Sequence, residues 1–110
     1  MDGNIEYVVV NTTVDGEEKA KELAGLLVRE KLAACVHRWP IQSVYMWKGA
    51  VESEPEQVLA AKTRKALVAE VIDFIKKHHP YEVPEIIVTP VIDGLRGYLD
   101  WVRAETREPR

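Results

Sequence analysis

The chain has little that would place it in a membrane or an oxidising compartment. Cys35 is the one cysteine among 110 residues, so no internal disulfide can form and an oxidising compartment gains no support. No apolar run reaches the roughly 18 residues needed to cross a bilayer, and the start lacks the basic-then-apolar order of a secretory signal. The sequence therefore predicts a cytoplasmic protein with no membrane association.

Positive charge and catalytic motifs are also scarce. The 18 acidic side chains outnumber the 15 basic ones, whereas nucleic-acid-binding proteins usually show a clustered basic face. The sequence contains no glycine-rich phosphate loop, no nucleophile elbow and no metalloprotease helix motif. We therefore expect neither a nucleic-acid partner nor an enzyme.

What is present suits one folded domain over residues 1–110, because the 46% hydrophobic content is typical of globular proteins. β-Branched apolar runs predict strands, and apolar residues at helical spacing predict helices. The expected order is a strand over 5–10, a helix from Gly16, a long interrupted strand to Trp47, a strand whose later half at 58–61 is buried, a helix to His78, a strand over 85–92 and a short helix around 95–102.

Several single residues mark the ends of these elements. Asp15 is expected to cap the first helix, with Glu18 reaching back as in a capping box. Pro80 should stop the second helix, and Pro90 must lie at a sheet edge or a strand end because it has no N–H to donate. The tail 107–110 has nothing to bury, so we expect it to fray.

The order strand, helix, strand, strand, helix, strand predicts an α+β fold, the split βαβ sandwich. Right-handed crossovers place both helices on one face of its sheet. The opposite face then has no cover, and its apolar side chains would form a larger patch than monomers usually expose. Self-association is therefore expected.

Five segments spread along the chain carry a family resemblance: 30–36 (EKLAACV), 43–49 (SVYMWKG), 62–63 (KT), 78–85 (HHPYEVPE) and 98–101 (YLDW). In order and spacing they resemble the signatures of the CutA divalent-cation-tolerance family. The resemblance implies a ferredoxin-like βαββαβ fold with a short C-terminal helix, related to the PII signalling proteins, and a homotrimer formed by strand pairing. It also implies a response to divalent metal ions, with copper binding as a proposed activity.

His78 and His79 are the candidate metal ligands, because imidazole is the commonest ligand for copper and zinc. The resemblance adds Asn11, which stands where some bacterial members carry a cysteine counted among the copper ligands. Its amide oxygen is a weaker ligand for copper(I) than a thiolate. However, adjacent histidines rarely close on one ion, and an imidazole at a helix end can simply hydrogen-bond free carbonyls. A metal role and a structural role both remain open for the pair.

Two other functions also remain open. A PII-like module could bind a small anionic ligand in a polar cleft between subunits, lined by Lys62, Glu56, Glu85 and Tyr81. Alternatively, a structural trimer could engage another protein through the aromatic residues of the region 39–47.

Overall fold

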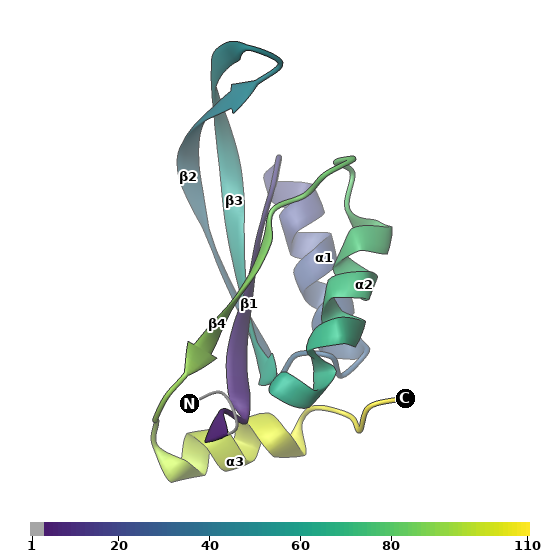
Figure 1. Ribbon diagram of the computed structural model, residues 1–110. Helices are drawn as coiled ribbons and strands as arrows, with labels where there is room; N and C mark the ends of the chain where they lie inside the picture. Colours follow the sequence, from purple (N-terminus) through teal and green to yellow (C-terminus); the bar gives the residue numbers. More distant parts are fainter. Residues whose placement is uncertain (1–3) are drawn as a thin grey trace.

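The computed structural model describes residues 4–110, in which four strands form one antiparallel sheet of order β2-β3-β1-β4. The strands are β1 (Tyr7–Val14), β2 (Cys35–Trp47), β3 (Ala50–Arg64) and β4 (Ile86–Val91). Helices α1 (Glu17–Arg29) and α2 (Val68–His78) lie on one face of the sheet, and α3 (Arg96–Ala104) crosses its lower end (Figure 1). The predicted α+β order, with both long helices on one face, is confirmed.

The hydrophobic core lies between the sheet and these two helices. Alternate residues of β1 point toward the helices, and Leu27 of α1 and Ile75 of α2 meet them with no exposed surface. Burying a side chain of this size contributes about 1.5–3 kcal/mol. The apolar helix stripes are therefore what fix both helices to the sheet.

The hairpin of β2 and β3 extends beyond the rest of the sheet as an arm (Figure 1). Its strands pair from Cys35 opposite Lys62 as far as Trp47 opposite Ala50. The two turn residues between them, Lys48 and Gly49, have φ angles of 50° and 83°, as type I′ turns require. The first half of β3 projects into solvent and its later half is buried, as predicted.

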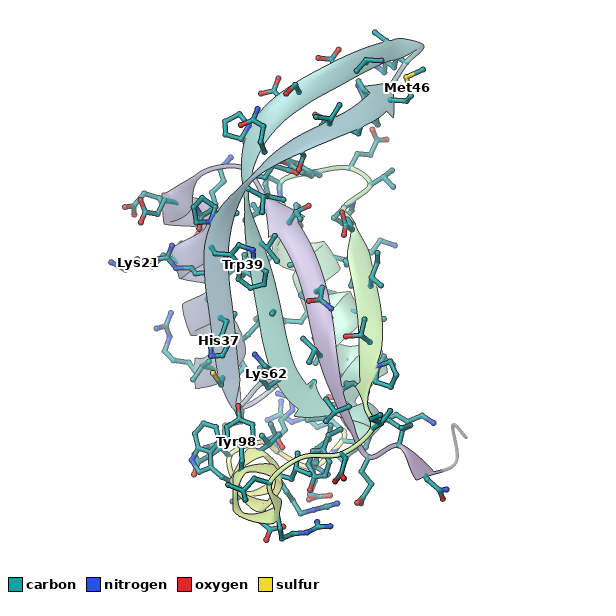
Figure 2. All side chains as sticks on the ribbon, turned by 90° about the vertical axis from the view of Figure 1, so that its left-hand side faces the viewer. Lys21, His37, Trp39, Met46, Lys62 and Tyr98 are labelled. Carbon is teal, nitrogen blue, oxygen red and sulfur yellow. The ribbon has the colours of Figure 1, made fainter. Side chains whose placement is uncertain are left out.

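The sheet face opposite the helices is uncovered over most of its area. Figure 2 shows His37, Trp39 and Lys62 projecting from this open face. Helix α3 covers only its lower end, where Tyr7 and Val102 are buried. A single chain therefore leaves one side of its sheet exposed to solvent.

One predicted element end and one predicted helix cap are wrong. Strand β1 continues to Val14 rather than ending at Val10, because its polar residues find partners across the sheet. Helix α1 has Gly16 at its N-cap position and no side-chain cap. The Asp15 carboxylate lies instead 3.6 Å from the Lys19 ammonium.

The C-terminal tail is anchored, which corrects the expectation that it frays. The Arg107 guanidinium donates to Glu70 over 2.7 Å, and the Arg107 backbone N–H donates to the Lys31 carbonyl over 2.9 Å. The Arg110 N–H donates to the other Glu70 oxygen over 2.8 Å, and buried Arg64 donates to the Arg107 carbonyl over 2.6 Å. Polar bonds hold a segment that has few apolar contacts to offer.

Candidate functional site

His78 ends α2 with an exposed ring. Its Nδ1 lies 2.9 Å from the carbonyl oxygen of Phe74, and the two rings stack with centroids 4.1 Å apart. A carbonyl only accepts, so Nδ1 carries the proton and Nε2 keeps its lone pair. Metal-binding histidines commonly hold their other N–H on a backbone carbonyl in this way. The local geometry leaves Nε2 of His78 able to bind a metal ion.

His79 is buried and both of its ring nitrogens have partners. Nε2 lies 2.7 Å from the carbonyl oxygen of Thr13 on β1, and the backbone N–H of Tyr81 donates to Nδ1 over 3.1 Å. The carbonyl must accept and the amide must donate, so the proton resides on Nε2. His79 would have to break one of these bonds to hold a metal, and its contacts instead tie the end of α2 to the sheet.

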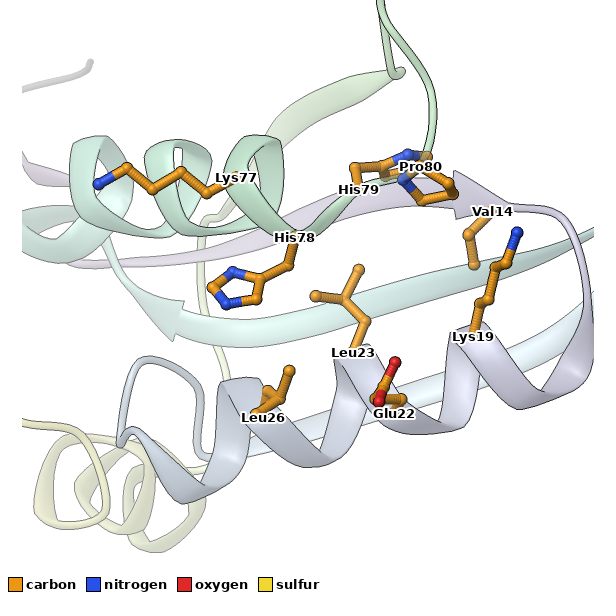
Figure 3. Close-up of a pocket in the computed structure, with 9 residues that line it drawn as sticks. All are labelled: Val14, Lys19, Glu22, Leu23, Leu26, Lys77, His78, His79 and Pro80. Carbon is orange, nitrogen blue, oxygen red and sulfur yellow. The ribbon is translucent and has the colours of Figure 1, made fainter.

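Asn11 does not meet the histidines within one chain. Its side chain lies on the open sheet face, where its amide nitrogen is 3.3 Å from the Val9 carbonyl oxygen and 3.4 Å from that of Ile87. His78 and His79 belong instead to the helix layer (Figure 3). Over residues 4–110, no cluster of three or more histidine, cysteine, aspartate and glutamate side chains could hold a metal ion.

A pocket of about 320 Å³ lies beside His78, between the end of α2 and the first half of α1 (Figure 3). Its charged lining residues are Lys19, Glu22 and Lys77. Lys19 is paired with Asp15, and Lys77 lies 3.3 Å from Asp73, which offsets the positive charge of both. Glu22 is the one carboxylate among the residues that line this pocket together with His78.

A second pocket of about 420 Å³, here called the arm pocket, lies where the arm leaves the sheet, and it contains three of the four predicted cleft residues: Glu56, Tyr81 and Glu85. The Tyr81 hydroxyl donates to Oε2 of Glu56 over 2.7 Å, and the Ser43 hydroxyl donates to Oε1 of Glu56 over 2.6 Å. Burial, followed by the bond to Glu56, raises the pKa of Tyr81. Ser43 was missed from the sequence, since it reaches Glu56 only in the observed strand register.

Lys62 lies apart from the arm pocket. Its ammonium is on the open sheet face, 2.8 Å from Nδ1 of His37. A single chain therefore does not combine the predicted cation with the carboxylates of Glu56 and Glu85.

Known proteins resemble this chain over most of its length. It matches the family model described as CutA1 divalent ion tolerance protein over residues 8–105. The rice (Oryza sativa subsp. japonica) protein named "Protein CutA 1, chloroplastic" is 44% identical over 105 residues, which are 94% of this chain and 59% of the rice protein. The chain therefore spans little more than half of that relative. The divalent-cation tolerance protein CutA of Thermus thermophilus is 43% identical over 89% of this chain and 96% of its own length.

Solved structures agree with the fold. CutA1 from Oryza sativa superposes with a TM-score of 0.93 at 42% identity, covering 96% of this chain and 97% of that one. The periplasmic divalent cation tolerance protein CutA from Archaeoglobus fulgidus gives a TM-score of 0.88 at 36% identity, covering 90% and 97%. No helix in residues 4–110 is long and apolar enough to span a membrane. The family match, the sequence identities and the shared ferredoxin-like architecture together show that this chain belongs to the CutA1 divalent ion tolerance protein family.

Proposed function

We propose that the protein acts as a homotrimer in tolerance to divalent cations, and that it binds a divalent metal ion such as copper through His78. The observation that carries this proposal is the match to a divalent ion tolerance family over residues 8–105. The proposed trimer explains the open sheet face, and the proposed ligand explains the free ring nitrogen at the end of α2.

The open sheet face supports self-association. Ile87 on β4 is 52% exposed and Trp39 on β2 is 45% exposed. Both β2 and β4 are edge strands with unpaired backbone groups on one side. Monomers rarely leave so much apolar surface and two such edges uncovered. Further copies of this chain would cover the apolar face and both strand edges. That the assembly contains three copies is inferred from the family resemblance.

Light scattering tests the assembly. We expect a mass three times the 12.5 kDa of one chain, and we expect Ile87→Glu to lower it because a charge would be buried at the contact. Val28→Glu is the matched control, since Val28 is 42% exposed on α1, away from the open face. A wild-type mass of one chain, or equal loss in both variants, would contradict the proposed interface.

The proposed metal site combines Nε2 of His78 with the carboxylate of Glu22. Copper and zinc both accept imidazole nitrogen and carboxylate oxygen. Two ligands are too few for tight binding, so the remaining positions would be filled by water or by side chains that assembly brings near.

Equilibrium dialysis against copper(II) and zinc tests the metal site. We expect saturable uptake that weakens in Glu22→Gln. Glu18→Gln removes the same charge from an exposed position on α1 and should leave uptake unchanged. Absence of uptake, or equal weakening in both variants, would count against this site.

Two further expectations belong to the proposal, and each of the two alternative functions has a structural requirement. We expect the protein to have no catalytic activity. We also expect it to lie in the cytoplasm, and cell fractionation tests that location directly. Anionic-ligand binding in a cleft between subunits would require assembly to bring Lys62 to the carboxylates of another chain. A scaffold role for the aromatic region 39–47 would require part of it to stay exposed in the trimer.

A further inference from the structure

The arm pocket has aromatic and acidic walls. Tyr45 and Trp47 of β2 contribute aromatic surface that is 42% and 50% exposed, and Tyr81 contributes a third ring from the loop before β4. Glu56 and Glu85 contribute the carboxylates. At about 420 Å³ the pocket falls within the size range of small-molecule sites.

The residues that line this pocket carry negative charge and no positive charge. No lysine, arginine or histidine is among the residues that line it. The donors to Glu56 are the neutral hydroxyls of Ser43 and Tyr81. Within residues 4–110, neither Glu56 nor Glu85 forms an ion pair with a basic side chain. An anion would be repelled here, and a cation would be attracted.

The electrostatics of Tyr45 agree with a negative pocket. Burial, and then the charges of Glu54, Glu56 and Glu52, raise the pKa of Tyr45. The three glutamates raise this pKa because their negative charges disfavour a phenolate. The same charges would favour a cation at this position.

Trp47 already attracts a cation in this structure. The ammonium nitrogen of Lys48 lies 5.7 Å from the centre of the Trp47 ring, within the range of cation–π contacts. Aromatic faces of this kind bind organic cations, whose apolar parts contact the rings while the charge meets the π-system or a carboxylate.

We propose that the arm pocket binds an organic ammonium ion, with its charge at Glu56 and Glu85 and its apolar part against Tyr45 and Trp47. A bare metal ion suits the site less well, because the pocket has no imidazole or thiolate and both oxygens of Glu56 already accept hydrogen bonds. This inference is independent of the metal site at His78, so either can fail alone.

The test is a titration of the assembled protein with benzylammonium, followed by the indole N–H signals of its three tryptophans in NMR spectra. Loss of one signal in Trp47→Phe assigns Trp47. We expect its signal to shift saturably with benzylammonium. Neutral benzyl alcohol and anionic benzoate have the same ring and should bind much more weakly.

Two variants locate the charge contact. Glu56→Gln keeps one acceptor oxygen for Ser43 or Tyr81, and its NH2 group can donate to the other hydroxyl. It should weaken benzylammonium binding about tenfold, since a charged hydrogen bond contributes about 1.4 kcal/mol or more. Asp100→Asn removes the same charge from α3 and should bind as wild type; melting curves of both confirm folding. An unmoved Trp47 signal, equal binding of benzyl alcohol or benzoate, or equal weakening in both variants would overturn the proposal.

Discussion

Replacing His79 with alanine is expected to destabilise the protein more than the same change at His78. His79 is 9% exposed, and its ring forms hydrogen bonds with the Thr13 carbonyl and the Tyr81 amide. Each buried polar group left without a partner costs about 1–3 kcal/mol. Water can reach the half-buried Tyr81, so the two losses together predict a decrease of about 2–4 kcal/mol in the free energy of unfolding.

Two comparisons make this prediction specific. His79→Gln places an amide nitrogen where it can donate to Thr13, so it should recover about 1 kcal/mol of the loss. His78→Ala removes an exposed bond to Phe74 at a helix end, so it should cost about 1 kcal/mol or less.

Urea unfolding is the assay, with every variant at the same chain concentration because assembly couples stability to concentration. The reasoning would be refuted by a cost for His79→Ala of under about 0.5 kcal/mol, the range of ordinary surface substitutions. A larger cost for His78→Ala would refute it too.

Three further predictions concern the fold. The hydrogen bond from Arg107, and then that from Arg110, lower the pKa of Glu70 below its ordinary value of 4.5. The wild type should therefore have a larger free energy of unfolding than Glu70→Gln above pH 4.5, and this difference should disappear as the pH falls through the lowered pKa. Acid unfolding of both proteins, followed by circular dichroism, measures it. Gly49→Ala puts a side chain at a φ of 83° and should cost about 1–2 kcal/mol in thermal melts. Leu27→Ala should cost about 2–5 kcal/mol in the same melts, whereas Leu95→Ala, at a site 79% exposed, should stay within about 0.5 kcal/mol.

The parts of the fold that were predicted correctly depend on residues close together in sequence. The apolar stripe of α2 and its stop at Pro80 are local patterns, and both agree with the observed helix Val68–His78. Pro90 lacks an N–H wherever the chain goes, and it lies on the edge strand β4. Interpreting such features requires no knowledge of distant partners.

The wrong predictions concern residues whose partners are distant. The polar end of β1 continues as strand because Thr12 donates to the Glu85 carbonyl, 73 residues later. The tail is held because Arg107 meets Glu70, 37 residues earlier. Neither pairing leaves a signal in the local sequence, since one threonine or one arginine is compatible with many environments.

The candidate site shows the same limit. Residue type and the family resemblance identified His78 and His79 as possible metal ligands. Which ring nitrogens have partners depends on Phe74 for His78, and on Tyr81 and Thr13, the latter 66 residues away, for His79. Lys62 was grouped with Glu56, Glu85 and Tyr81 as polar groups able to line one cleft between subunits. Lys62 lies six positions along β3 from Glu56, and it is not among the residues of the arm pocket.

Calorimetric titration of the metal-free protein with copper(II), run in parallel on His78→Ala and His79→Gln, tests the central claim most directly. We predict saturable binding by the wild type and by His79→Gln, and its loss in His78→Ala. Of these two neighbouring histidines, His78 keeps one ring nitrogen without a hydrogen-bond partner in residues 4–110, whereas both ring nitrogens of His79 have partners. Binding lost in His79→Gln but kept in His78→Ala, binding unaffected by either change, or no binding by the wild type would contradict the account.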